Sequence, residues 1–172
     1  TTTTISWTTY GQLTSVEILY STDGGLTYTS LGTVGATSSP YAWNVPNKIG
    51  NNLMVKVKDA ASGSTVAGVS SVFKIKGGIV INAPTALTEW SVKSEHNTQW
   101  TPVGTYTSKS VRLDYSPDGT TWTEIATTAA GAHGVQQSYP WTPAGTDIGT
   151  GRYIKITTLY GDADIDVSTT LS

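Results

Sequence analysis

The sequence predicts an all-β protein made of two similar β-sandwich domains, and three observations support this fold class. First, Thr and Ser supply 31 and 18 of the 172 residues, whereas charged residues make up only 13 %. β-Branched Thr favours strands, and few Lys and Glu remain to favour helices. Second, short apolar-polar alternations are separated by Gly and Asp turns, and no helical apolar stripe runs over three turns. Third, one pattern of strands and turns occurs twice.

The repeat divides the chain near residue 77. Its matched segments, in chain order, are Trp7 with Trp100, 16–24 with 111–119, 27–29 with 121–123, 41–43 with 139–141, 55–57 with 154–156, and 69–70 with 167–168. The last match also aligns Phe73 with Leu171. The spacing between matched segments drifts smoothly, as expected when insertions fall in loops. We therefore predict domains 1–77 and 78–172, joined by a short Gly-containing segment at Lys76-Gly77-Gly78.

Strands and hairpins follow from local patterns within each copy. Alternation over 16–20 and 53–57 in the first copy, and over 111–115 in the second, predicts strands with one buried and one wet face. The turns at Asp23-Gly24-Gly25 and Asp118-Gly119 carry residues that tolerate positive φ, so each is expected to close a hairpin. These turns also resemble the Asp box of sialidase-type propellers, an element in which the Asp fixes the turn.

The two copies differ at their first strand. The second copy begins with an apolar segment, 79–84, that ends in Pro before the chain reaches Trp100. The first copy has only six residues before Trp7, so we expect it to lack this N-terminal strand. The second copy also stops at Leu171-Ser172, roughly where the first continues. An unpaired sheet edge left by a missing strand invites pairing with another chain.

The motifs together resemble a known domain family. In the second copy they are Ala83-Pro84, Glu89-Trp90, Gln99-Trp100-Thr101, the 111–119 segment, Tyr139-Pro140-Trp141-Thr142-Pro143 and Tyr153-Ile154-Lys155-Ile156. They are similar to the Ser/Thr-rich Ig-like domain found in tandem in prokaryotic secreted and surface proteins, including S-layer proteins, and in fungal cell-wall proteins. The resemblance implies two tandem Ig-like or fibronectin-like β-sandwiches in an extracellular, cell-surface protein.

Composition excludes several classes of function. A net charge of −2 argues against nucleic-acid binding, which needs a basic face. No apolar run approaches the roughly 20 residues that span a bilayer. Without Cys there is no disulfide framework, thiolate metal site or Cys nucleophile. His96 and His133 lack a metal-ligand spacing and no carboxylate pair stands out, so we expect no enzyme.

Aromatic residues are the first candidate for binding, because exposed rings stack on sugars. Trp7, Trp43, Trp100 and Trp141 recur at matching places and are expected to be core residues. Tyr28 and Trp122 lie beside the predicted turns, where partial exposure is expected. Trp90 and Tyr106 have no counterpart in the first copy. The candidate glycan contacts are therefore Trp90, Trp122, Tyr28 and Tyr106.

A calcium site is the second candidate. Asp162, Asp164 and Asp166 alternate along the chain, so in an extended conformation their carboxylates lie on one side. Ca²⁺ takes six to eight oxygen ligands, often from acidic loops. The alternative is an acidic edge strand whose charges face water and block aggregation. Apart from calcium, no cofactor is expected.

The expected function is a non-catalytic structural segment of a large cell-surface or S-layer protein, acting as a spacer or lattice-forming module. Its partners would be neighbouring Ig-like domains or copies of itself, and glycans. The alternative is a carbohydrate-binding or adhesive accessory module of a secreted enzyme. The high Thr content fits O-glycosylation of a surface protein as well as plain strand propensity.

Overall fold

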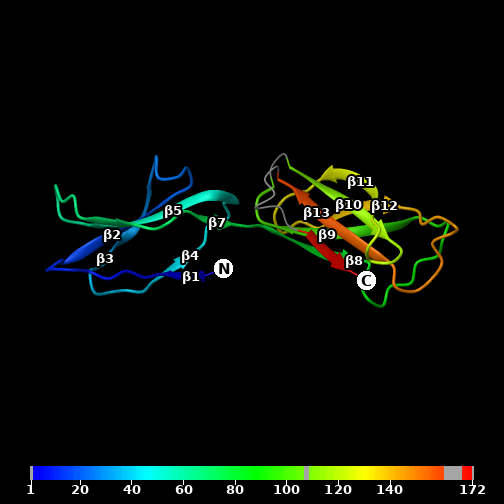
Figure 1. Ribbon diagram of the computed structural model, residues 1–172, viewed down its shortest axis with the longest axis horizontal. Helices are drawn as coiled ribbons and strands as arrows, with labels where there is room; N and C mark the ends of the chain where they lie inside the picture. Colours follow the sequence, from blue (N-terminus) through cyan, green and yellow to red (C-terminus); the bar gives the residue numbers. More distant parts are fainter. Residues whose placement is uncertain (1, 107–108, 161–167, 172) are drawn as a thin grey trace. The chain divides into compact units, whose positions relative to one another are not determined.

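The computed structural model describes residues 2–106, 109–160 and 168–171. The chain forms two compact units, which we call unit 1 (Thr1–Ile75) and unit 2 (Lys76–Ser172) (Figure 1). This division falls two residues before the one predicted from the repeat. The described elements are all strands, their ladders are all antiparallel, and no helix occurs among the described residues. The all-β prediction is thus confirmed.

Unit 1 consists of two antiparallel sheets. Its strands are β1 (Thr2–Ile5), β2 (Ser15–Ser21), β3 (Thr29–Gly35), β4 (Tyr41–Asn44), β5 (Gly50–Asp59), β6 (Ala67–Val69) and β7 (Phe73–Ile75). The small sheet pairs β1 with β4, and the larger one has the order β3-β2-β5-β6, with β7 also pairing with β5. Ile5 and Trp43 from the small sheet pack on Ile18 and Val55 from the larger one. This shared apolar core holds the two sheets face to face.

Unit 2 is built in the same way, with one more strand in its smaller sheet. Its strands are β8 (Gly78–Ala83), β9 (His96–Val103), β10 (Ser110–Ser116), β11 (Thr123–Ala129), β12 (Gln137–Trp141), β13 (Tyr153–Leu159) and β14 (Ser168–Leu171). The sheets have the orders β12-β9-β8 and β11-β10-β13-β14. Trp100 on β9 is 1 % exposed, and Leu113 on β10 and Ile156 on β13 are fully buried. Alternate residues of β9, β10 and β13 thus face a common core.

The repeat seen in the sequence is also a repeat of strand pairing. Val16 lies opposite Asp59 in the β2–β5 ladder, and its counterpart Val111 lies opposite Thr158 in the β10–β13 ladder. The ladder register shifts directly after Ile18 in unit 1 and at the matching point in unit 2. Because the pairing repeats with the sequence, each set of matched residues occupies the same place in its own unit.

The last strand requires a correction to the sequence alignment. Val69 on β6 lies opposite Lys56, and the residue opposite the matching Lys155 is Thr170 on β14. Val69 therefore corresponds to Thr170 and not to Val167, which lies outside the described residues. The predicted match of Phe73 with Leu171 is also wrong. Phe73 belongs to β7 and pairs with Leu53 of β5, and β7 has no counterpart in the described part of unit 2. Short Thr- and Ser-rich segments carry too little pattern to fix a register.

The smaller sheets differ at one edge. In unit 2, β9 lies between β12 and β8, whereas in unit 1 the matching strand β1 pairs with β4 alone among the described strands. The described residues of unit 1 thus include no counterpart of β8, and none of them pairs with the second edge of β1.

Candidate functional site

Tyr28 and Trp122, two of the predicted glycan contacts, occupy matching places beside the hairpin turns. The Lys56 ammonium nitrogen lies 5.2 Å from the centre of the Tyr28 ring, and that of Lys155 lies 3.9 Å from the centre of the Trp122 ring. A cation at this distance is attracted to the ring face and shields it. Both aromatic rings are half-buried, and each has one face already occupied by a lysine.

Tyr106 does not offer a ring to a sugar. It is only 2 % exposed and packs edge-on against Tyr160, with ring centres 6.4 Å apart. The expectation of a glycan contact rested on its having no counterpart in the first copy. A residue special to one unit can also fill a space special to that unit's core, and Tyr106 does so.

Trp90 lies in a cleft of unit 2 of about 680 Å³, which we call the aromatic cleft. The residues that matter for its chemistry are Trp90, Tyr115, Trp141, Asp147, Arg152 and Tyr153. Trp90 comes from the connection between β8 and β9, Tyr115 from β10, and Trp141 from the end of β12. The other three come from the connection between β12 and β13 and from the first residue of β13.

The aromatic rings of the cleft form a connected wall. Trp90 stacks on His96 with ring centres 5.0 Å apart and planes 6° apart, and it meets Trp141 at 6.1 Å and 61°. Trp141 in turn contacts Tyr115 at 5.0 Å. His96 Nε2 lies 2.8 Å from the Ser91 carbonyl oxygen, a hydrogen bond that holds the imidazole under Trp90. The Trp90 ring is therefore fixed in orientation although it is only half-buried.

Polar groups stand beside this wall. Arg152 donates from Nη1 to the Pro117 carbonyl oxygen at 2.7 Å and from Nη2 to that of Ile148 at 2.6 Å, so its guanidinium is held in place. The Asp147 carboxylate accepts a hydrogen bond from the Ala144 amide at 2.7 Å. These contacts bring one fixed cation and one fixed anion to the cleft.

The Tyr115 hydroxyl is the unusual group in the cleft. Tyr115 is 9 % exposed, and its hydroxyl makes no hydrogen bond within the part of the chain that the structure describes. Burial raises the pKa of Tyr115, and the negative charge of Asp147 raises it further against a smaller opposing effect of Arg152. The phenol therefore stays neutral at physiological pH, and a neutral phenol can donate one hydrogen bond.

Sequence reasoning found Trp90 but not the polar residues of the cleft. Neither Arg152 nor Asp147 was singled out from the sequence. Extending the match of 55–57 with 154–156 aligns Arg152 with Leu53. The difference between the two copies is what could have identified this position, because an apolar residue in the first copy corresponds to a charged guanidinium in the second. Positions where two copies of a scaffold differ in charge are the ones to inspect first.

The two Asp turns are structural, as predicted. Asp23 accepts hydrogen bonds from the Ser21 hydroxyl at 2.7 Å and from the Thr27 amide at 2.9 Å. The hydrogen bonds from Thr27 and Ser21 lower the pKa of Asp23 to about 2. The pKa of Asp118 is lowered in the same way, mainly by the Thr121 and Thr120 amides. Both carboxylates are thus occupied in closing their hairpins.

The predicted calcium ligands Asp162, Asp164 and Asp166 lie outside the described residues. Within the described ranges, no group of three or more His, Asp or Glu side chains is placed to hold a metal ion. His133 accepts a hydrogen bond from the Gly104 amide at 3.1 Å, and His96 belongs to the aromatic cleft.

Comparisons with protein-family models, with curated proteins and with solved structures found no match. The residues that the structure describes include no helix able to cross a membrane.

Proposed function

We propose that this chain is a non-catalytic structural segment of a large cell-surface or S-layer protein, in which two Ig-like β-sandwiches act as spacer or lattice-forming modules. The observation that carries the proposal is the repetition of strand order and pairing register in the two units. Repeated units of one build extend a protein by stacking modules, with stability added unit by unit.

The features that recur in both units serve the scaffold. The Trp7 indole N–H donates to the Ala36 carbonyl oxygen at 3.0 Å, and the Trp100 indole N–H donates to that of Ala130 at 3.0 Å. The Asp turns and the lysine-covered aromatic rings recur as well. What has been kept in both copies is therefore packing, turn closure and hydrogen bonding, which supports a structural role over a catalytic one.

Pulling a single molecule between its ends tests this role. We expect two separate unfolding events, because the two units are 75 and 97 residues long and extend to roughly 260 and 340 Å at roughly 3.5 Å per residue. Each event should lengthen the molecule by that extended length less the end-to-end distance of the folded unit. A core variant of unit 2 should change the force of the longer event only, which serves as the control. One event that spans the whole chain, or hydrolysis of polysaccharides by the intact chain, would contradict the proposal.

A second candidate function is carbohydrate binding, and the aromatic cleft is the observation that favours it. Sugar rings present apolar faces and many hydroxyl groups. The cleft offers Trp90 with a fixed ring orientation, a guanidinium, a carboxylate and the phenol hydroxyl of Tyr115. A few well-placed polar groups beside an apolar wall are typical of small-molecule sites. Both proposals place the chain outside the cell.

Titration of the full chain with soluble oligosaccharides of glucose, xylose and N-acetylglucosamine tests this second function. Trp90→Ala is expected to weaken binding about tenfold or more, because it removes the stacking surface. Leu87→Ala is the matched control, since Leu87 lies on the same connection, is 94 % exposed and does not line the cleft. Absence of heat with every oligosaccharide, or equal losses in the two variants, would exclude the cleft as a sugar site.

A further inference from the structure

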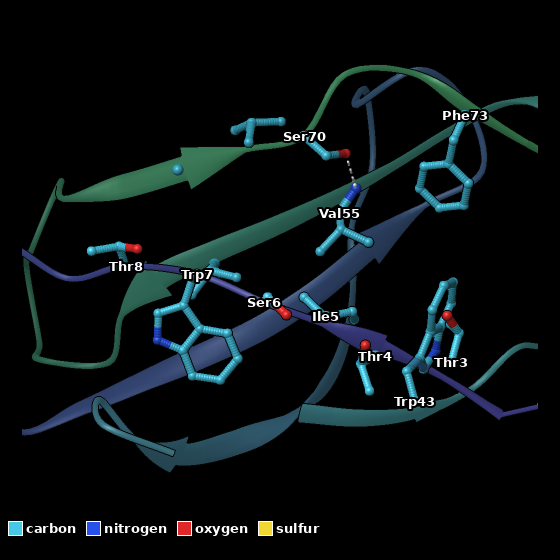
Figure 2. Close-up of a pocket in the computed structure, with 13 residues that line it drawn as sticks. Thr3, Thr4, Ile5, Ser6, Trp7, Thr8, Trp43, Val55, Ser70 and Phe73 are labelled. Carbon is cyan, nitrogen blue, oxygen red and sulfur yellow. Dashed lines mark hydrogen bonds between the residues drawn. The ribbon is translucent and has the colours of Figure 1, made fainter. Parts of the chain in front are cut away.

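Unit 1 has a groove of about 560 Å³ beside β1 (Figure 2). One wall is the segment Thr3–Thr8, which includes the end of β1 and the residues after it. The opposite wall comes from β5 and β6, and Phe73 closes one end. The residues lining the groove carry no charge, and several are apolar: Ile5, Trp7, Trp43, Val55, Val57, Val69 and Phe73.

Unit 2 shows what occupies the matching place. There β8 runs antiparallel to β9, with Ile79 opposite Pro102 and Ile81 opposite Trp100. β8 also contacts β13 and β14, the two strands at the edge of the larger sheet. It thereby closes the side of the sandwich between the two sheets.

The repeat shows where the same strand would lie in unit 1. Trp100 corresponds to Trp7, and both indoles donate to a matching alanine carbonyl oxygen, so the two residues occupy the same site. A counterpart of β8 would therefore run along Ser6–Tyr10, a segment that belongs to no strand in the structure. The strands that correspond to β13 and β14 are β5 and β6, which form the far wall of the groove. The groove thus lies where β8 would lie.

Burial confirms that apolar surface is left open there. Trp100 is 1 % exposed and Ile156 is fully buried, whereas their counterparts Trp7 and Val57 are only partly buried. Apolar surface of this kind, beside a segment that belongs to no strand, is complementary to an added strand.

We infer that this groove is an acceptor site for an extended peptide strand with the chemistry of β8. The strand would pair antiparallel with Ser6–Tyr10 and present β-branched apolar side chains at alternate positions to Trp7 and Val57. The uncharged lining selects a neutral, apolar segment over an acidic or basic one. The site is distinct from the aromatic cleft, and it gives the proposed spacer a means of joining to another polypeptide segment.

The test uses the full ¹⁵N-labelled chain and a synthetic peptide with the sequence of residues 76–84, which contains β8. In this chain unit 2 already holds its own β8, so the added peptide is expected to bind unit 1. We expect amide shift changes confined to the neighbourhood of Thr3–Tyr10, β5 and β6, together with a change in the Trp7 indole signal. A peptide with Asp in place of the residues corresponding to Ile79 and Ile81 should bind about tenfold more weakly or not at all.

Gly68→Leu provides the blocking variant. Gly68 lines the groove, and a Cβ added there meets no atom within 4 Å, so a larger side chain fills the groove without disturbing the strand. We expect this variant to fold normally and to lose peptide binding about tenfold or more. Val66→Leu is the control, because Val66 is exposed and lies outside the groove.

Three results would overturn the inference. One is the absence of shift changes in unit 1 at millimolar peptide, and another is equal binding by Gly68→Leu and wild type. The third is concentration-dependent pairing of the chain with itself through β1 in the absence of peptide, since the occupant would then be a second copy and not an extended segment.

Discussion

Alanine in place of Trp100 is expected to lower the free energy of unfolding of unit 2 by about 3–5 kcal/mol. Trp100 is 1 % exposed at the centre of β9, so its removal leaves a cavity that the surrounding strands fill only in part. The indole also donates to the Ala130 carbonyl oxygen, and Ala130 is fully buried. The variant therefore loses both apolar packing and a buried hydrogen bond.

Trp7→Ala is the matched comparison for this prediction. Trp7 makes the same hydrogen bond to Ala36, but its ring borders the open groove and is only partly buried. We expect a smaller loss in unit 1, about 1–3 kcal/mol, because less apolar surface returns to water. Urea unfolding of the full chain, followed by circular dichroism and by amide signals of each unit, measures both losses.

A conservative variant separates the two contributions at Trp100. Trp100→Phe keeps an aromatic ring but removes the indole N–H, so it should cost less than alanine and include about 1 kcal/mol from the lost hydrogen bond. Equal losses in Trp7→Ala and Trp100→Ala would mean that the two rings are buried alike in solution, contrary to the structure.

Removing both cations around Asp114 is expected to cause the second large loss of stability. Asp114 lies on β10 with its side chain 5 % exposed, and Arg112 Nε and Lys155 Nζ lie 3.1 and 3.8 Å from its Oδ2 atom. The double variant Arg112→Met and Lys155→Met keeps the apolar stems but leaves a buried carboxylate without compensation. Unit 2 should lose about 3–5 kcal/mol of unfolding free energy.

The first copy indicates how to rescue this double variant. The residue at the place of Asp114 in unit 1 is Leu19, which lies opposite Lys56 just as Asp114 lies opposite Lys155. Adding Asp114→Leu to the double variant should restore most of the lost stability, because a buried ion group is often replaced by apolar residues without cost. Denaturant unfolding of the double and triple variants decides the point. A triple variant as unstable as the double variant would show that the carboxylate charge is not the cause.

The two predictions rest on different kinds of information in the sequence. The place of Trp100 could be predicted because Trp recurs at that point in both copies. Recurrence alone does not fix the degree of burial, because Trp43 and Trp100 are buried as predicted whereas Trp7 and Trp141 are only half-buried. The Asp114 cluster could not be predicted, because Arg112 and Asp114 alternate along one strand and look like an ordinary wet face. Lys155 reaches Asp114 only because β13 pairs with β10 in a particular register.

The candidate sites show the same limit. Trp90 was singled out because the first copy lacks it, and the structure places it in a cleft. Tyr106 was singled out for the same reason and is buried. A missing counterpart marks a residue as special to one unit, but it does not tell whether the special feature is a cleft or a core space. Only the packing of neighbouring elements separates the two cases.

The sequence by itself determined the strand-rich class, the division into two units, the hairpin turns and most of the strand matches between the copies. These features follow from local propensity, period-two alternation and repetition, which need no knowledge of distant contacts. Tertiary structure alone decided which sheet edges meet, which rings lie under lysines and where the aromatic cleft and the unit 1 groove form. These depend on residues far apart in the chain, and their positions are fixed only when the sheets pair and pack.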